Sequence, residues 1–217
     1  MEEYVERHID PEPSHLKRLY RRANLRLLYT RMMSGHAQGR LLKMLTAMIR
    51  PGRVLEIGAY AGYATLCLAE GLTEGAVVDT VEIDDELEPF LREAFDDSPY
   101  AEKINLHIGN ALDVVPSLAA KGLGWEMALI DADKRLYPEY YRMLLRVMKP
   151  GSWILADNTL WNGKVALNGR SSDPQLQGIL EFNDMVAADD RVEKVIIPMR
   201  DGLTLIHIKP NAQWLPE

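Results

Sequence analysis

Apolar residues recur along this chain with two different periods, and the change between them predicts its secondary structure. Within residues 13–30 the apolar side chains fall mostly three or four positions apart, the spacing of an amphipathic helix: Leu16, Leu19, Tyr20, Ala23, Leu27 and Leu28. A second, shorter helix is predicted over about residues 37–49. After Pro51-Gly52 come a short apolar strand ending at Ile57, a loop that contains glycine, and a helix that stops near Gly71.

Strand and helix then alternate almost to the end of the sequence. We predict strands over 76–84, 104–109, 125–131 and 152–157, and helices over about 84–95, 111–118, 137–148 and 174–188. The last two strands, 192–199 and 203–210, are joined by the short turn Arg200-Asp201-Gly202, which predicts an antiparallel hairpin. Strands separated by helices pair in parallel, so we expect an α/β fold with a doubly wound, mostly parallel sheet of seven strands.

Composition excludes several classes of protein. The 217 residues are 47% hydrophobic and 26% charged, which suits one globular domain, with 1–50 as a helical cap and 51–217 as the core. A formal net charge of -7 argues against a broad surface for nucleic acid. One basic cluster is either a contact for an acidic partner or an ordinary solvated helix face: Lys17, Arg18, Arg21, Arg22 and Arg26.

Cysteine content and the N-terminus bear on the compartment. Cys67 is the only cysteine, which excludes an intrachain disulfide and a zinc site built from cysteines. The acidic N-terminus lacks the apolar core of a signal peptide, and no run approaches the ~20 apolar residues that cross a bilayer. We therefore expect a cytoplasmic protein with no membrane partner.

Four predicted strands end in an acidic residue: Glu56, Glu82, Asp131 and Asp157. Ligands of open parallel sheets bind outside the carboxyl ends of the strands, so residues at these positions are functional candidates. A surface or capping role explains any one of these acids alone. Four at equivalent positions indicate a ligand site.

The first loop, Gly58-Ala59-Tyr60-Ala61-Gly62, has the spacing G-x-x-x-G and lacks the G-x-G-x-x-G of a pyrophosphate-binding turn. Glu56 would repel a diphosphate but suits a ligand with positive charge. S-adenosylmethionine carries an ammonium and a sulfonium and no phosphate. Glu82 lies 24 residues beyond Gly58, near the spacing at which a carboxylate accepts hydrogen bonds from ribose hydroxyls. These residues favour S-adenosylmethionine over a nicotinamide dinucleotide.

Oxygen donors end the fourth and fifth predicted strands. Asp131 with Asp157 and Asn158 offers two carboxylates and an amide, a set that suits Mg²⁺, Mn²⁺ or Ca²⁺ better than zinc. A turn or helix cap is the alternative for Asp157-Asn158. Lys134 either neutralises these acids or acts as a general base, since a nearby cation lowers the pKa of an ammonium group.

Two neighbouring residues keep alternative roles. Trp161 forms an apolar wall for a planar substrate or is simply a packed tryptophan of the loop. Asp133 contacts the cofactor or orients Lys134, and the residues alone do not choose between these roles.

Six segments occur in the order of a known family: "LEIGAYAGYATLCLAEGL", "VEIDDE", "IGNALDVVPSL", "LIDADKRLYPEYY", "ILADNTLWNGKV" and "RDGLTLIHI". From about Met32 to Ile208 the chain resembles the cation-dependent O-methyltransferases, which include caffeoyl-coenzyme A and catechol O-methyltransferases. The resemblance implies a Rossmann-like fold with extra N-terminal helices, and a homodimer.

The resemblance also implies roles for individual residues. Metal ligands would be Asp131, Asp157 and Asn158, and Lys134 would be the catalytic base. Cofactor contacts would come from Ser34, Glu56, Gly58, Ala59, Tyr60, Glu82, Ala111, Asp131 and Asp133. Trp161 and Asn162 match positions that line the substrate pocket.

Three departures from the family pattern stand out. Ala64 replaces a serine near the methionine carboxylate, with Thr65 or a water as the candidate substitute. Arg200 replaces a glycine before the last strand, in a turn that often uses the conformational freedom of glycine. The N-terminal segment, which shapes the acceptor pocket in this family, matches only weakly.

These observations predict methyl transfer from S-adenosylmethionine to one hydroxyl of a vicinal dihydroxyphenyl compound, with a divalent cation bound to both oxygens and Lys134 accepting the proton. Direct attack needs no covalent enzyme intermediate. The alternatives are a nicotinamide-dependent oxidoreductase and a regulatory protein that binds S-adenosylmethionine without turnover. A binder without turnover would need neither a metal nor a base.

Overall fold

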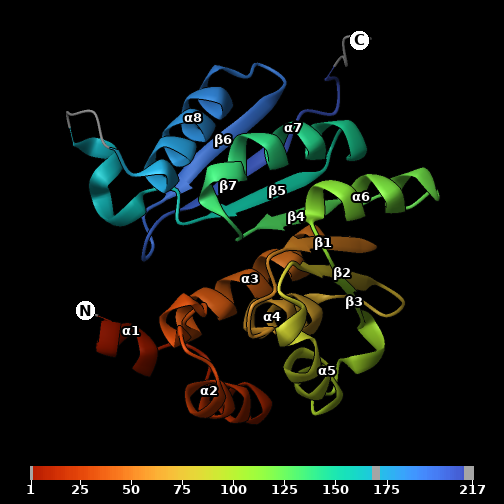
Figure 1. Ribbon diagram of the computed structural model, residues 1–217, viewed down its shortest axis with the longest axis vertical. Helices are drawn as coiled ribbons and strands as arrows, with labels where there is room; N and C mark the ends of the chain where they lie inside the picture. Colours follow the sequence, from red (N-terminus) through yellow and green to blue (C-terminus); the bar gives the residue numbers. More distant parts are fainter. Residues whose placement is uncertain (1, 168–171, 213–217) are drawn as a thin grey trace.

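The computed structural model describes residues 2–167 and 172–212, and within them the strands form a seven-stranded sheet (Figure 1). The strands are β1 Arg53–Ile57, β2 Val77–Glu82, β3 Ile104–Ile108, β4 Met127–Ile130, β5 Trp153–Asp157, β6 Val192–Ile197 and β7 Leu203–Ile208. Their order is β3-β2-β1-β4-β5-β7-β6. Strands β1 to β5 are parallel, and β7 is antiparallel to both β5 and β6. The predicted mostly parallel sheet with a hairpin at its end is confirmed.

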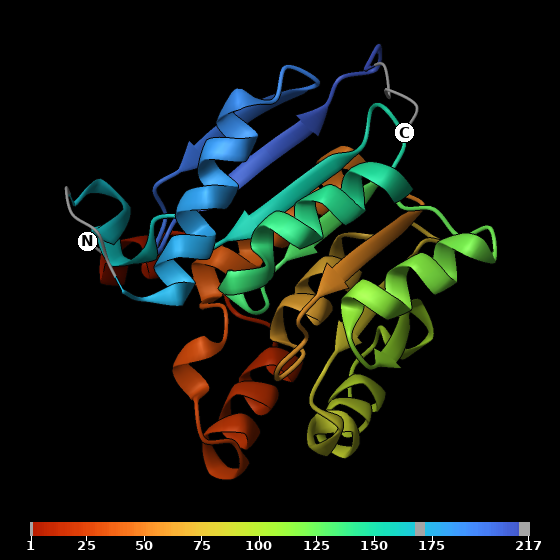
Figure 2. The same cartoon turned by 45° about the horizontal axis from the view of Figure 1, so that its top comes forward.

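Helices cover both faces of this sheet. They are α1 Glu2–Arg7, α2 Ser14–Arg26, α3 His36–Ile49, α4 Tyr63–Gly71, α5 Glu88–Asp96, α6 Ala111–Ala120, α7 Tyr137–Val147 and α8 Pro174–Ala188. Short 3₁₀ turns lie between them: η1 Thr30–Met32, η2 Asp85–Leu87, η3 Ala101–Lys103, η4 Lys134–Leu136 and η5 Trp161–Ala166. Figures 1 and 2 show α3, α4 and α5 on one face and α6, α7 and α8 on the other.

Each face has its own hydrophobic core, because side chains of a strand point alternately to the two sides. Val54 of β1 packs with residues of α3, α4 and α5, while Leu55 and Ile57 pack with residues of α6, α7 and α8. Among the described residues, no helix has the length and apolar character needed to cross a bilayer.

The first predicted helix is shorter than its apolar pattern suggested. Helix α2 ends at Arg26, because the backbone of Leu27 turns to an extended conformation with φ -111° and ψ 149°. Leu28 therefore lies beyond the helix and is 89% exposed. Tyr20 is 48% exposed, because it lies off the buried face of α2, which carries His15, Leu16, Leu19 and Ala23.

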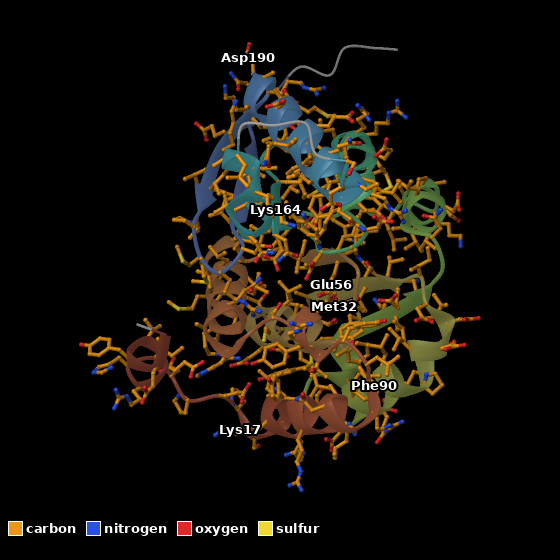
Figure 3. All side chains as sticks on the ribbon, turned by 60° about the vertical axis from the view of Figure 1, so that its left-hand side comes forward. Lys17, Met32, Glu56, Phe90, Lys164 and Asp190 are labelled. Carbon is orange, nitrogen blue, oxygen red and sulfur yellow. The ribbon has the colours of Figure 1, made fainter. Side chains whose placement is uncertain are left out.

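The basic cluster of α2 is used inside the molecule. Arg22 and Arg26 bind the two carboxylate oxygens of Glu93 on α5, at 2.8 Å and 2.5 Å. Arg18 donates to Asp97 at 3.1 Å, while Lys17 points outward (Figure 3). Three of the five basic residues therefore hold α2 against α5, a use that neither interpretation from the sequence anticipated.

Candidate active site

The four acids at the strand ends come together at one edge of the sheet. Glu56, Glu82 and Asp131 lie close enough for their charges to interact, and Asp157 lies close to Asp131. Beside them is a pocket open to solvent, with about 250 Å³ of empty space including its mouth. It is lined by Met32, Met33, Ser34, Gly58, Ala59, Tyr60, Ala61, Tyr63, Ala64 and Asp131. The segment before α3, the loop after β1 and the end of β4 thus share one cavity.

Glu56 is fully buried, with 0% of its surface exposed, and lies in the interior of the molecule (Figure 3). Its Oε2 accepts hydrogen bonds from the hydroxyls of Thr65 and Thr80, at 2.5 Å and 2.6 Å. Its Oε1 has no hydrogen-bond partner within the described parts of the chain. Burial, together with the charges of Asp131 and Glu82, raises the pKa of Glu56 to about 7. A buried carboxylate with one unsatisfied oxygen is suited to a cationic ligand group.

The loop after β1 depends on glycine and on Glu82. Gly58 has φ +99°, and a Cβ built there would lie 2.2 Å from the carbonyl oxygen of Asp131. Tyr60 has φ 46°, a left-handed conformation that costs a residue other than glycine ~1–2 kcal/mol. The carboxylate of Glu82 offsets this strain because it accepts from the N–H groups of Tyr60 and Asp84, at 2.7 Å and 3.0 Å.

Two further candidates for cofactor contact, Ser34 and Ala111, and the replaced serine position at Ala64 lie in different places. Ser34 is buried in the wall of the pocket. Ala111 is buried at the start of α6 and is not among the residues that line the pocket. Ala64 lines the pocket, but Thr65 donates its hydroxyl proton to Glu56 and is not a donor in place of the serine that is absent there.

Lys134 lies against Asp131. Its Nζ donates to Asp131 Oδ1 at 2.8 Å and lies 5.2 Å from the centre of the Tyr137 ring. Burial by itself lowers the pKa of Lys134, but Tyr137 and the Asp131 carboxylate outweigh it and hold the pKa above the usual value of lysine. Lys134 is therefore an ammonium group in this arrangement.

Helix α8 fixes the backbone of Lys134. Gln175 Oε1 accepts the Lys134 N–H at 3.0 Å, and a Cβ at Gly178 would lie 2.3 Å from the Lys134 carbonyl oxygen. Asp133 instead pairs with Arg135, whose hydrogen bonds hold the pKa of Asp133 below its usual range. Its contacts give no support to the suggestion that Asp133 orients Lys134.

Asp157 and Asn158 end β5 as predicted. Asp157 is buried, and its two oxygens accept from the Gln38 side chain at 2.7 Å and from the Asn158 N–H at 2.8 Å. Burial and the Asp131 carboxylate raise the pKa of Asp157. Tyr137 donates its hydroxyl to the carbonyl oxygens of Ile130 and Asp157, at 3.1 Å and 3.0 Å, which ties the ends of β4 and β5 together.

This donor set fits a divalent cation. Asp157 is buried and Asp131 is partly exposed, and a positive charge between these two mutually repelling carboxylates would stabilise both; oxygen donors suit Mg²⁺, Mn²⁺ or Ca²⁺. The residues described contain no group of three His, Cys, Asp or Glu side chains able to hold a metal. With Asp131 and Asp157, a third oxygen ligand would have to come from a group such as the amide of Asn158.

Trp161 and Asn162 lie in the loop after β5, both with left-handed backbones at φ 45° and 53°. The indole of Trp161 is half-buried and donates to Asp173 Oδ2 at 3.1 Å. The Asn162 N–H donates to the Asp201 carboxylate, and the side chain of Asn162 is exposed. The loop is thus held by both α8 and the turn before β7.

Three residues that hydrogen-bond to Asp157 or Lys134 were not predicted from the sequence: Gln38, Tyr137 and Gln175. Tyr137 lies in the stretch "DADKRLYPEYY", and a tyrosine at the start of a helix directly after candidate ligands was the available signal. Gln38 lies 119 positions from Asp157, and no local pattern marks such a contact.

Comparisons with known proteins agree on one family. The family model described as O-methyltransferase matches residues 6–209. The chain is 34% identical to a catechol O-methyltransferase of Niastella koreensis, over 79% of this chain and 80% of that protein. It is 33% identical to caffeoyl-CoA O-methyltransferase 2 of Zea mays, over 89% and 76%. The crystal structure of the O-methyltransferase TomG from Streptomyces achromogenes in complex with SAM has a TM-score of 0.88 and 26% identity, and the match covers 95% and 94%.

Proposed function

Because this chain belongs to the O-methyltransferase family and is an S-adenosylmethionine-dependent enzyme, we propose that it methylates one hydroxyl of a catechol-like small molecule with the help of a divalent cation. One observation carries the proposal. The ion pair of Lys134 and Asp131 lies beside the buried Asp157, at the same strand edge as the pocket. The names of the relatives, a catechol and a caffeoyl-CoA O-methyltransferase, support a vicinal dihydroxyphenyl acceptor.

On the cofactor side, Glu56 supplies the carboxylate oxygen that has no partner in the described residues, suited to the ammonium of S-adenosylmethionine. Glu82 keeps free lone pairs for ribose hydroxyls after accepting two backbone N–H groups. Gly58 and Ala59 let the ligand approach the backbone, and Ser34 covers it from the N-terminal side. Contacts from Tyr60, Ala111, Asp131 and Asp133 complete the proposed set.

Asp131, Asp157 and Asn158 would hold the cation. When bound there, Mg²⁺, Mn²⁺ or Ca²⁺ would supply Lewis acidity, lowering the pKa of a coordinated hydroxyl and fixing its direction. Tyr137 holds the two strand ends in register, so that Asp131 and Asp157 stay at a constant separation. Mg²⁺ is our first choice because carboxylate and amide oxygens are hard donors.

Lys134 would accept the proton of the attacked hydroxyl at its Nζ. As an ammonium it cannot do so, and its charge is favoured by Asp131. Positive charge near Asp131 weakens this effect and lowers the pKa of Lys134 towards the range of a general base. Only 8% of the residue is exposed, so little water competes for the proton.

Trp161 and Asn162 would line the acceptor side, since the contacts with Asp173 and Asp201 hold their loop in place. We also propose a homodimer and a single domain over residues 1–217. Light scattering of the purified chain measures the dimer directly, and a monomer at micromolar concentration contradicts it. The family membership leaves no support for the oxidoreductase alternative.

Matched acceptors test the substrate class. The enzyme is supplied with labelled S-adenosylmethionine, Mg²⁺ and either 3,4-dihydroxybenzoate or one of the two monohydroxybenzoates with the hydroxyl at position 3 or 4. We expect methylated product from the vicinal diol alone, identified by mass spectrometry, because only two adjacent oxygens chelate a cation. Equal turnover of the monohydroxy compounds contradicts the catechol-like acceptor.

A further inference from the structure

Gln38 joins the N-terminal helices to the proposed cation site through a buried hydrogen bond. The side chain is 4% exposed, and its Nε2 donates to Asp157 Oδ2 at 2.7 Å. The bond crosses 119 positions of sequence, so it exists only because α3 reaches the carboxyl end of β5. The second oxygen of Asp157 accepts the Asn158 N–H. Gln38 therefore supplies the side-chain contact that sets the orientation of this carboxylate.

Contacts with α4 hold the start of α3, which carries Gln38, in place. A Cβ at Gly39 would lie 2.7 Å from Cys67 Sγ and 2.9 Å from a ring carbon of Tyr63, so α3 and α4 are in direct contact there. Arg40 makes two hydrogen bonds to Glu70 of α4, at 2.8 Å and 2.6 Å. Because α4 follows directly on the loop after β1, these contacts connect the start of α3 to the cofactor pocket.

The residues just before Gln38 belong to that pocket. Met32, Met33 and Ser34 form its N-terminal wall. Arg200, in the turn between β6 and β7, has a left-handed backbone at φ 50° and donates from Nη1 to the Met33 carbonyl oxygen at 3.4 Å. The segment 32–38 thus runs from the cofactor pocket to Asp157. It is held by the buried contact at Gln38, the longer contact from Arg200 and a hydrogen bond between His36 Nε2 and the Asp10 carbonyl oxygen at 2.8 Å.

We propose that Gln38 is a positioning residue for Asp157 and that, through it, cation binding and cofactor binding strengthen each other. A cation that orders Asp157 also orders its partner Gln38, and with it the wall formed by residues 32–34. Coupling of this kind is reciprocal, so the cofactor must tighten cation binding by the same factor. The inference rests on the proposed cation site.

Cation affinity is the first test, measured without turnover from the electron paramagnetic resonance signal of Mn²⁺. Gln38→Met keeps the length of the side chain and removes the donor, and Gln38→Asn withdraws the amide by one methylene. Loss of a partner that orients a metal-binding carboxylate weakens affinity by roughly 10–100-fold, and we expect this of both variants. Thr46→Val, a buried change further along α3, controls for general loosening of the helix and leaves the affinity unchanged.

Asp157→Ala separates failure of the site from failure of the inference. If the wild type does not bind Mn²⁺, or binds it as tightly after Asp157→Ala, the proposed cation site is wrong and the inference falls with it. If Asp157→Ala abolishes binding while Gln38→Met and Gln38→Asn bind as the wild type does, the site stands and the role of Gln38 is overturned.

Coupling is measured from the Kd of S-adenosylmethionine with and without Mg²⁺. We expect Mg²⁺ to lower this Kd in the wild type and to leave it unchanged in Gln38→Met. Hydrogen exchange of the 32–38 amides should slow on adding Mg²⁺ in the wild type only. The same Mg²⁺ effect on cofactor Kd in both proteins would contradict the coupling.

Discussion

Replacing Glu56 with glutamine should make the protein more stable, because burial of this carboxylate opposes folding. The same change should weaken cofactor binding. In the folded chain its pKa rises from the usual 4.5 to about 7. Folding therefore disfavours the charged form. The resulting loss of unfolding free energy grows as pH rises from about 4.5 to about 7 and is constant above that range. Below about 4.5 both states bind the proton and Glu56 has no such effect.

The magnitude follows from these values. At ~1.4 kcal/mol per pKa unit, ionised Glu56 lowers the free energy of unfolding by roughly 3 kcal/mol at pH 8.5, and by only about 1 kcal/mol at pH 5. Glu56→Gln removes the charge and keeps the shape of the side chain. The variant should therefore regain nearly the whole of this unfolding free energy at each pH, less any strain in the contacts with Thr65 and Thr80. Natural proteins commonly lose stability at a binding residue in this way.

Urea unfolding of the wild type and Glu56→Gln at pH 5 and pH 8.5 measures the effect, with the exposed Glu86→Gln as a control that should change nothing. S-adenosylmethionine should raise the Tm of the wild type more than that of Glu56→Gln, because the variant offers no carboxylate to the ammonium group of the cofactor. A stability difference between wild type and Glu56→Gln that is equal at both pH values refutes the reasoning.

Three further changes test other parts of the account. Gly58→Ala, which puts a methyl 2.2 Å from the Asp131 carbonyl, should abolish cofactor binding in a calorimetric titration; unchanged affinity contradicts the close approach. Lys134→Met should lower kcat by ~10²–10⁴ and leave cofactor affinity unaltered; kinetics with normal kcat would exclude it as base. Hydrogen bonds from His107, Arg53 and Trp125 lower the pKa of Asp79 to about 2 despite burial, so its stabilisation is present above pH ~3.8 and is lost towards pH 2. Asp79→Asn should lose roughly 2 kcal/mol of stability at pH 7, and acid unfolding of the wild type and the variant at the same pH contradicts this.

Much of the fold, and the acidic residues of the candidate site, can be predicted from the local pattern of apolar and polar residues. A buried strand has an apolar run, and an acid at its end is visible in the sequence wherever the run stops, as at Glu56 and Asp157. Parallel strands then place these ends at one edge without further information. The mostly parallel sheet and the cluster of carboxylates at one of its edges were predictable for this reason.

Contacts between distant segments were not predictable in the same way. Gln38 is one polar residue in a helix, and only the packing of α3 shows that it reaches Asp157. The arginines of α2 looked like a solvated face because their partner Glu93 lies on another helix. The periodicity gave too long a first helix, since the extended backbone of Leu27 has no signature in the apolar pattern.

The central claim is that methyl transfer depends on a cation held by the strand-end carboxylates. Its most direct test is the initial rate of methyl transfer from labelled S-adenosylmethionine to catechol, with Mg²⁺ and with excess chelator, for the wild type and Asp157→Ala. The account predicts product only for the wild type with Mg²⁺, while both proteins retain cofactor binding. Wild-type activity that survives the chelator, or full activity of Asp157→Ala, would contradict it.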